Sequence, residues 1–307
     1  MISIAELKKA YGSHEALKGI SLSIKEGEFY GLLGPNGAGK TTTISIMSSI
    51  LKPDSGTVSI NGANIYEYPS ETKGIIGVVP QEIALYNDFS AFENLMFWGS
   101  LYFVPKQELI KQANDTLKLV GLYDRRNDKV GSYSGGMKRR INIAAALLHK
   151  PRVLFMDEPT VGIDIQSRNL IFEIIEQLHR GGMTIVYTTH YMEEAQRLCS
   201  RIGIIDDGRI IAEGTLNELR DSSKAKETII VTFNNITEDI AAHLQSFWED
   251  SSRLEEKVIF YTSNMNADLP KIISRSNEAG AEIQNIELQK LNLETIFLNL
   301  TGKQLRD

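Results

Sequence analysis

The sequence predicts an α/β fold with a mainly parallel sheet, followed by a smaller α+β domain. Short apolar runs alternate with helical patterns through residues 1–221. Two of these runs, residues 153–156 and 184–187, are almost entirely apolar, which is typical of central strands that helices cover on both faces. Because a helical pattern at residues 166–179 separates them, the three segments predict a strand, a crossover helix and a second, parallel strand.

The other elements follow from the same periodicities: period two for strands, and spacings of three and four for helices. In the first part we expect strands at residues 2–7, 20–24 and 29–33 and helices at residues 41–51 and 137–148. In the second part we expect strands at residues 228–233, 258–262 and 282–288 and helices at residues 239–248, 269–278 and 293–300. Residues 221–226 are small and polar, as linkers are, which predicts two domains, 1–221 and 222–307.

The composition excludes several classes of protein. A single cysteine among 307 residues rules out a disulfide scaffold. The net charge of −6 gives no overall attraction to nucleic acid or anionic lipid. No apolar stretch reaches the roughly 18 to 20 residues that a membrane helix needs, and the first residues lack the layout of a signal peptide. We therefore expect a soluble intracellular protein, which would have to dock if it serves a membrane.

A phosphate-binding loop stands at residues 34–41, where the sequence matches G-x-x-x-x-G-K-[ST]. The loop follows a predicted strand and precedes a predicted helix, which is the context this motif requires. Its glycines let the backbone point N–H groups at phosphates, and the helix adds the positive end of its dipole. Lys40 supplies a cation for the β and γ phosphates, and the hydroxyl of Thr41 is a ligand for Mg²⁺. The alternative is a glycine-rich turn with a chance lysine.

An acidic pair, Asp157 and Glu158, follows the buried strand at residues 153–156. A carboxylate at the end of such a strand is costly to bury unless it faces a cation or hydrogen-bond donors. Mg²⁺ is the expected partner of Asp157, and Glu158 is placed to act on an attacking water as general base. Taken alone, the pair could instead begin a solvated loop.

A second anion-binding composition occurs at Ser134, Gly135 and Gly136, just before a predicted helix. A hydroxyl and two glycines at a helix start can present N–H donors to an anion. Since the loop around Lys40 is already complete, the second nest suggests a nucleotide held between two copies of the protein.

The order and spacing of these motifs resemble the ATP-binding subunits of ABC transporters over residues 1–220. Residues 34–42 resemble the Walker A loop, residues 153–158 Walker B, and residues 133–137 the ABC signature. In the same way Gln81 matches the Q-loop glutamine, Asp164 lies in the D-loop, His190 matches the switch histidine, and Tyr11 falls where the family stacks an aromatic ring on adenine.

The resemblance implies the functional residues. Glu158, His190 and Gln81 would be catalytic, with Glu158 acting on water and His190 contacting the γ phosphate. Mg²⁺ would be held by Thr41, Gln81 and Asp157. ATP would be bound by Tyr11, Gly34, Pro35, Asn36, Gly37, Ala38, Gly39, Lys40, Thr41, Thr42, Ser134, Gly135, Gly136 and Asp164. Taken singly, Tyr11 could be an ordinary strand aromatic, Gln81 a plain loop residue and His190 a structural histidine.

The resemblance also implies the fold and the partners. The fold would be a P-loop NTPase domain with a mainly parallel core sheet, an antiparallel β subdomain and a helical subdomain, followed by the small C-terminal α+β domain. A second nucleotide-binding domain, expected to be an identical copy, would complete each ATP site in head-to-tail arrangement. A separate integral membrane permease would hold the chain at the inner face of the cell membrane, and we expect no nucleic acid partner.

Two features indicate a branch of the family. Residues 133–140 read Tyr-Ser-Gly-Gly-Met-Lys-Arg-Arg, with Tyr133 and Met137 where Leu and Gln are common, and the D-loop carries Ile165 where Pro is frequent. This signature looks like that of ABC-2-type exporters of the daunorubicin-resistance kind, and residues 291–302 resemble the closing helix of their C-terminal extension. The basic triplet Lys138, Arg139 and Arg140 could otherwise be a solvated helix start.

Docking to the permease is expected at residues 86–104, which contain Glu93, Phe97 and Trp98, with a plain core helix as the alternative. A soluble ABC ATPase that works on ribosomes or DNA is the second hypothesis for the whole protein. A phosphate-loop kinase or GTPase is the third, although it predicts no second glycine nest.

Overall fold

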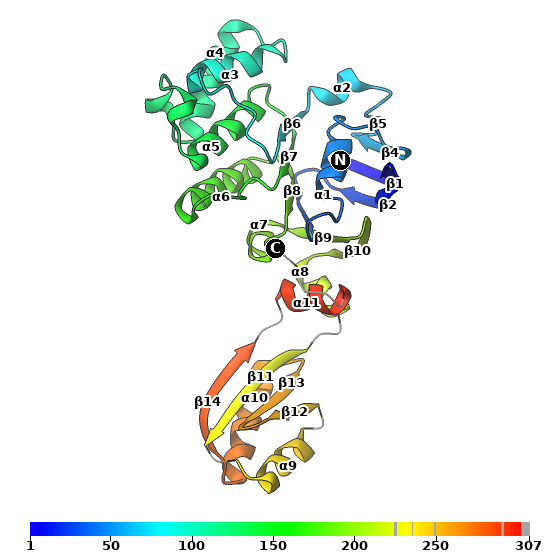
Figure 1. Cartoon of the computed structure of the whole chain (residues 1–307), viewed down its shortest axis with the longest axis vertical. Coiled ribbons are helices and arrows are strands. Elements are labelled where there is room, and N and C mark those ends of the chain that lie inside the picture. Colours follow the sequence, from blue (N-terminus) through cyan, green and yellow to red (C-terminus); the bar gives the residue numbers. More distant parts are fainter. Residues whose placement is uncertain (224–225, 235, 249, 290–291, 302–307) are drawn as a thin grey trace. The chain divides into compact units, whose positions relative to one another are not determined.

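The computed structural model describes residues 1–223, 226–234, 236–248, 250–289 and 292–301. The chain divides into two compact units, one of Met1–Leu216 and one that begins at Asn217 (Figure 1).

A six-stranded sheet forms the centre of the first unit, in the order β10-β9-β3-β8-β7-β6. Its pairs β3/β8, β3/β9, β7/β8 and β6/β7 are parallel, and only the pair β9/β10 is antiparallel. Every residue of β3, β7 and β8 is buried, which confirms the prediction from the apolar runs. The strands are β3 (Phe29–Leu33), β6 (Ile76–Val79), β7 (Val153–Asp157), β8 (Thr184–Thr189), β9 (Arg201–Asp206) and β10 (Arg209–Gly214).

A second sheet of the first unit is antiparallel, in the order β2-β1-β4-β5. The strands are β1 (Ile2–Tyr11), β2 (His14–Ile24), β4 (Ser55–Ile60) and β5 (Ala63–Asn64). The first two are longer than predicted, because they form a hairpin that pairs as far as Tyr11 and His14. Its apolar side packs with α1 and the central sheet in one core, to which Ile20, Ile44 and Phe155 belong.

Helices complete the first unit: α1 (Lys40–Met47), α2 (Pro69–Lys73), α3 (Ala91–Ser100), α4 (Lys106–Leu119), α5 (Gly135–Ala146), α6 (Ile165–Arg180) and α7 (Met192–Leu198). Short 3-10 turns lie at Tyr123–Arg125 and Val130–Ser132. Helices α3, α4 and α5 gather on the side of the central sheet away from the antiparallel sheet (Figure 1). Helix α1 ends earlier than predicted, because Ser49 takes a left-handed conformation with φ 62°.

The second unit has a four-stranded antiparallel sheet in the order β12-β13-β11-β14. Apolar residues of β11 and β13, such as Val231 and Phe260, share a core with Leu244 of α9 and Ile272 of α10. The strand β12 was not predicted, because its sequence, Ser-Ser-Arg-Leu, has no apolar alternation. The elements are α8 (Leu216–Ser222), β11 (Glu227–Asn234), α9 (Glu238–Phe247), β12 (Ser251–Leu254), β13 (Lys257–Thr262), α10 (Met265–Glu278), β14 (Glu282–Gln289) and α11 (Leu293–Thr301).

Candidate nucleotide-binding site

The phosphate loop connects β3 to α1 and lies directly against its neighbours. A Cβ atom on Gly34 would lie 2.2 Å from the carbonyl oxygen of Ile205, and one on Gly39 would lie 2.8 Å from that of Ala16. Gly39 also has φ 106°, which side chains rarely tolerate. Both positions therefore require glycine. No side chain caps the start of α1 at Lys40 among the described residues, which leaves the N–H groups of its first turn for an anion.

Lys40 is buried, at 5% exposure, and lies folded back over the loop. Its Nζ donates to the carbonyl oxygens of Gly34, at 2.9 Å, and Pro35, at 3.0 Å. The same Nζ lies 3.0 Å from Oε1 of Glu158. The ammonium group thus has three oxygen partners within the protein.

Three residues that are far apart in the sequence converge on the carboxylate of Glu158. Besides Lys40, Gln81 Nε2 donates to Oε2 at 3.3 Å, and His190 Nδ1 lies 3.1 Å from Oε1. Burial alone would raise the pKa of Glu158, but the hydrogen bonds from His190 and Lys40 outweigh it and hold the pKa below its usual value. The backbone of Glu158 has φ 43°, a strained conformation that costs on the order of 1 to 3 kcal/mol.

Asp157 ends β7 and is also buried, at 4% exposure. The hydroxyl of Thr188, its partner across the β7/β8 pair, donates to Oδ1 at 2.6 Å, and the Thr41 side chain also hydrogen-bonds the carboxylate. Burial nevertheless raises the pKa of Asp157, because these neutral donors do not replace the lost solvation. A hard divalent cation would compensate for that burial, and a carboxylate beside a hydroxyl is a donor set that suits Mg²⁺.

A cavity of about 300 Å³ opens over the loop. It brings together nine of the predicted site residues: Tyr11, Asn36, Gly37, Gly39, Lys40, Thr41, Thr42, Gln81 and Glu158. Tyr11 reaches it from the end of β1 and is 51% exposed. His14 and Ala16 also line the cavity, and no sequence pattern marks them, because only the hairpin of β1 and β2 brings them there. Thr188 likewise belongs to no sequence motif, although its hydroxyl additionally accepts the N–H of Glu158 at 3.0 Å.

The second nest lies elsewhere in the unit, at the first turns of α5 and α6. Ser134 caps α5 by accepting the N–H of Met137, and Asp164 caps α6 by accepting the N–H of Ser167 at 2.9 Å. The cap hydrogen bonds from Ser167 lower the pKa of Asp164. The two helix starts are in close contact, since a Cβ atom on Gly136 would lie 2.2 Å from Oγ of Ser167. None of the predicted residues of this nest lines the cavity over the phosphate loop.

The basic triplet after the nest is not the solvated helix start that we considered. Arg139 is buried at 4% exposure, and Lys138 and Arg140 are half-buried. Arg139 donates to two carbonyl oxygens of the loop that carries Gln81. The sequence shows no such role, because consecutive basic residues look alike until helix packing separates them.

The parallel sheet, the glycine-bounded loop and the acidic pair together define a P-loop nucleotide hydrolase. Over residues 17–161 the sequence matches the family model described as ABC transporter. It is 46% identical to linearmycin resistance ATP-binding protein LnrL of Bacillus subtilis (strain 168), over 100% of both chains. It is 36% identical to Nod factor export ATP-binding protein I of Cupriavidus metallidurans, over 100% of this chain and 99% of that one. It is 34% identical to daunorubicin resistance ATP-binding protein DrrA3 of Streptomyces coeruleorubidus, over 99% of this chain and 97% of that one.

Solved structures agree with this result. A dimeric ATP-binding cassette in a post-hydrolysis state, bound to ADP and Pi, matches with a TM-score of 0.65 and 30% identity, over 70% of this chain and 99% of that chain. An ATP-binding subunit of an ABC transporter matches with a TM-score of 0.66 and 27% identity, over 72% and 92%. The chain therefore belongs to the ABC transporter ATP-binding proteins, in the group that serves ABC-2-type exporters, and it binds and hydrolyses ATP.

ATP-binding proteins of this family work with membrane permeases and form dimers. Among the described residues, no helix combines the length and apolarity that crossing a membrane requires. The alternatives of a ribosome- or DNA-directed ATPase and of a kinase or GTPase are not favoured, since the relatives that match along the whole chain are export and resistance ATP-binding proteins.

Proposed function

We propose that two copies of this chain bind two ATP·Mg²⁺ between them, head to tail, and drive export through a separate permease. The observation that carries this proposal is the division of the anion-binding groups. Lys40 and its loop line one cavity, whereas Ser134, Gly135 and Gly136 lie outside it. A nucleotide held by Lys40 thus leaves the second nest free to bind the phosphates held by another copy.

Within each site the side chains take different roles. The loop N–H groups and Lys40 bind the β and γ phosphates, and Tyr11 stacks on adenine. Thr41, Asp157 and Gln81 would hold Mg²⁺, which would neutralise phosphate charge when bound. Glu158 accepts a proton from the attacking water, and His190 contacts the γ phosphate.

The ion pair of Lys40 and Glu158 supplies a physical reason for ordering these events. Phosphate oxygens compete for the Lys40 ammonium, which now holds two loop carbonyls and Glu158. When the ammonium turns to phosphate, the Glu158 carboxylate loses one of its hydrogen-bond donors. One oxygen of the carboxylate then becomes available to accept a hydrogen bond from the attacking water when a substrate is present.

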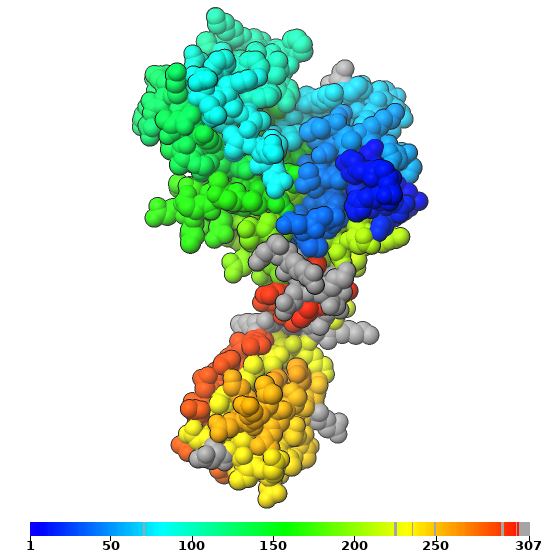
Figure 2. Space-filling view, in the orientation of Figure 1, coloured from blue at the N-terminus to red at the C-terminus, as the bar shows by residue number. Residues whose placement is uncertain are grey.

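The permease docks on the first unit around α3. One face of α3 is core, with Ala91, Asn94 and Leu95 buried. Aromatic rings gather on the other face and beside it, where Tyr86 is 46% exposed and contacts Phe97. The exposed face of this segment, which lies in cyan at the surface of the first unit (Figure 2), thus supports the proposed interface, while its other face packs in the core.

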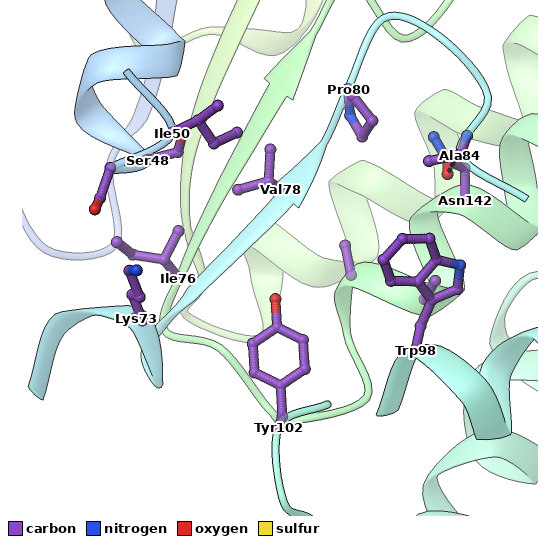
Figure 3. Close-up of a pocket in the computed structure, with 13 residues that line it drawn as sticks. Ser48, Ile50, Lys73, Ile76, Val78, Pro80, Ala84, Trp98, Tyr102 and Asn142 are labelled. Atoms are coloured by element: carbon purple, nitrogen blue, oxygen red, sulfur yellow. Dashed lines mark hydrogen bonds between the residues drawn. The ribbon is translucent and has the colours of Figure 1, made fainter. Parts of the chain in front are cut away.

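A mainly apolar pocket of about 380 Å³ lies beside this segment. Figure 3 shows Trp98 and Tyr102 projecting toward the face of β6 that carries Ile76 and Val78. An apolar segment of the permease could bury itself there, which would attach the chain to the inner face of the membrane. We assign the ATPase role to residues 1–221 and an accessory role in the assembly to residues 222–307, and we assign no nucleic acid partner.

Copurification tests this function against the ribosome and DNA alternative. A tagged Glu158→Gln chain is expressed in its native host, and ATP is added to the cell extract. The chain is then purified from detergent-solubilised membranes. We expect a multi-span membrane protein in stoichiometric amount, and its loss when Trp98 and Tyr102 are both replaced by Ser. Recovery of the chain on ribosomes or nucleic acid, with none in the membrane fraction, would contradict the proposal.

A further inference from the structure

The loop after β6 carries Gln81 but has no regular structure from Pro80 to Tyr86. Its conformation therefore depends on contacts from outside. Helix α5 supplies three of them, from two residues that are three apart and share a face of the helix. Arg139 donates from Nη1 to the carbonyl oxygen of Pro80 at 2.7 Å and from Nη2 to that of Gln81 at 2.5 Å, and Asn142 accepts the N–H of Ala84 at 3.4 Å.

Burying the charge of Arg139 at this position carries a large desolvation cost. Its burial lowers the pKa of the guanidinium, against the opposing charge of Asp157, and the hydrogen bonds of its two Nη atoms go to neutral carbonyl oxygens. A buried charge whose hydrogen bonds are to neutral carbonyls contributes little to stability, and a well-packed apolar side chain would cost less. The guanidinium instead contributes a defined geometry, because its rigid planar fork fixes the positions of two successive carbonyl groups at once.

We propose that Arg139 is a positioning residue, which holds the backbone of the Gln81 loop so that the Gln81 amide meets the carboxylate of Glu158. The chain of contacts is continuous: Arg139 binds the carbonyl of Gln81, and the Gln81 side chain donates to Glu158 at 3.3 Å. Arg139 also stands on the helix that starts with Ser134, Gly135 and Gly136. A nucleotide bound to that helix start by another copy would thus act on the Gln81 loop of this copy through one rigid helix.

Kinetics of the full-length chain test this inference with a matched control. Arg139→Met removes all donors at similar length. We expect kcat to fall by between about 10- and 100-fold, the cost of misplacing a group that acts on the substrate, with KM changed by less than about twofold. Arg140→Met is the control: Arg140 is half-buried in the same helix, but donates to the carbonyl of Val120 at 2.6 Å. It should keep kcat within about twofold of the wild type.

Hydrogen–deuterium exchange supplies a readout that general destabilisation would not produce. In Arg139→Met, exchange should rise in a peptide that covers residues 80–86 and stay unchanged in one that covers α1. If Arg139→Met does not fold, Arg139→Gln, which keeps one donor group and buries no charge, should show the same rise in exchange and an intermediate kcat. Unchanged exchange and kcat in the folded variant, or an equal loss in Arg140→Met, would overturn the inference.

The inference rests on the proposed roles of Gln81 and Glu158. The positioning role of Arg139 and those proposed roles can fail separately. If Glu158→Gln hydrolyses ATP normally, the proposed site is wrong whatever Arg139 does. If Glu158→Gln is inactive while Arg139→Met is fully active, the site stands and only the positioning role is wrong.

Discussion

Lys40 and Glu158 form a buried ion pair in the candidate site: Nζ lies 3.0 Å from Oε1, and each residue is only 5% exposed. Removing one partner of such a pair typically costs about 3 to 5 kcal/mol, because the other charge stays buried without compensation. The phosphates of ATP offer the ammonium a replacement partner. The pair therefore lets Lys40 exchange Glu158 for phosphate, while Glu158 keeps its contacts with Gln81 and His190.

Replacement of Glu158 by Gln tests its role in hydrolysis. Gln keeps the shape of the side chain and its contact with Gln81 but cannot take a proton from water. We expect turnover to fall by about 10²- to 10⁴-fold, while ATP still binds. Phosphate release and nucleotide binding, measured on the same preparation, check the two parts. Undiminished steady-state hydrolysis would exclude Glu158 as the base.

A complementation experiment tests the composite site. Lys40→Ala and Ser134→Arg should each abolish hydrolysis in a homodimer, because every site then lacks one half. A mixed dimer of the two variants has one site with both halves intact, so the mixed dimer, isolated through a different affinity tag on each chain, should have about half of the wild-type rate if the two sites act independently. The control is the mixed dimer of the doubly substituted chain with the wild type, isolated in the same way, since it has no intact site. No activity in the first mixed dimer would contradict the head-to-tail arrangement.

Replacing each of the two glycines of the signature by Ala should change the stability of the protein by different amounts. A Cβ atom on Gly136 would lie 2.2 Å from Oγ and 2.3 Å from Cβ of Ser167, whereas one on Gly135 has Ile163 Cδ1, at 3.8 Å, as its nearest neighbour. Gly136→Ala should therefore lower the free energy of unfolding by about 1 to 3 kcal/mol, and Gly135→Ala should change it by less than about 0.5 kcal/mol. Denaturant unfolding of both variants compares them, and equal midpoints would contradict the packing.

Glu194 should matter for stability although no motif marks it. It is 3% exposed and accepts hydrogen bonds from the hydroxyls of Thr160, at 2.7 Å, Tyr187, at 2.9 Å, and Thr189, at 2.9 Å. Glu194→Ala would leave these buried hydroxyls without their acceptor, which should cost about 3 kcal/mol or more. Its neighbour Glu193 is exposed, so Glu193→Ala is a matched control with an expected effect within about 0.5 kcal/mol. Thermal unfolding of the two variants measures the difference.

Tyr11 should contribute to nucleotide affinity through its ring. It is half exposed at the mouth of the cavity, and stacking on a base contributes about 1 to 3 kcal/mol. Tyr11→Ala should weaken ATP binding by about tenfold or more, whereas Tyr11→Phe, which keeps the ring, should bind like the wild type. Titration with ATP distinguishes stacking from the alternative of an ordinary strand aromatic, for which the two variants would bind alike.

Most of the core of the fold could be predicted from local patterns. The strands at residues 153–156 and 184–187 and the helix between them occur as expected, because strands buried on both faces have an apolar run that few other structures require. The hairpin of β1 and β2 was underestimated, because residues 8–11 and 14–19 have no regular apolar alternation and pair through the partner strand. The short strand β12 was missed because its sequence also lacks apolar alternation.

The sequence by itself determined the phosphate loop, the acidic pair and the second nest, since each is a contiguous motif whose chemistry follows from residue type and spacing. Only the tertiary structure decided which residues meet: Lys40, Gln81 and His190 at Glu158, and Arg139 at the Gln81 loop. The physical reason is that such contacts depend on sheet register and helix packing between distant segments. A buried arginine and a solvated one therefore look the same in the sequence, and only the fold distinguishes them.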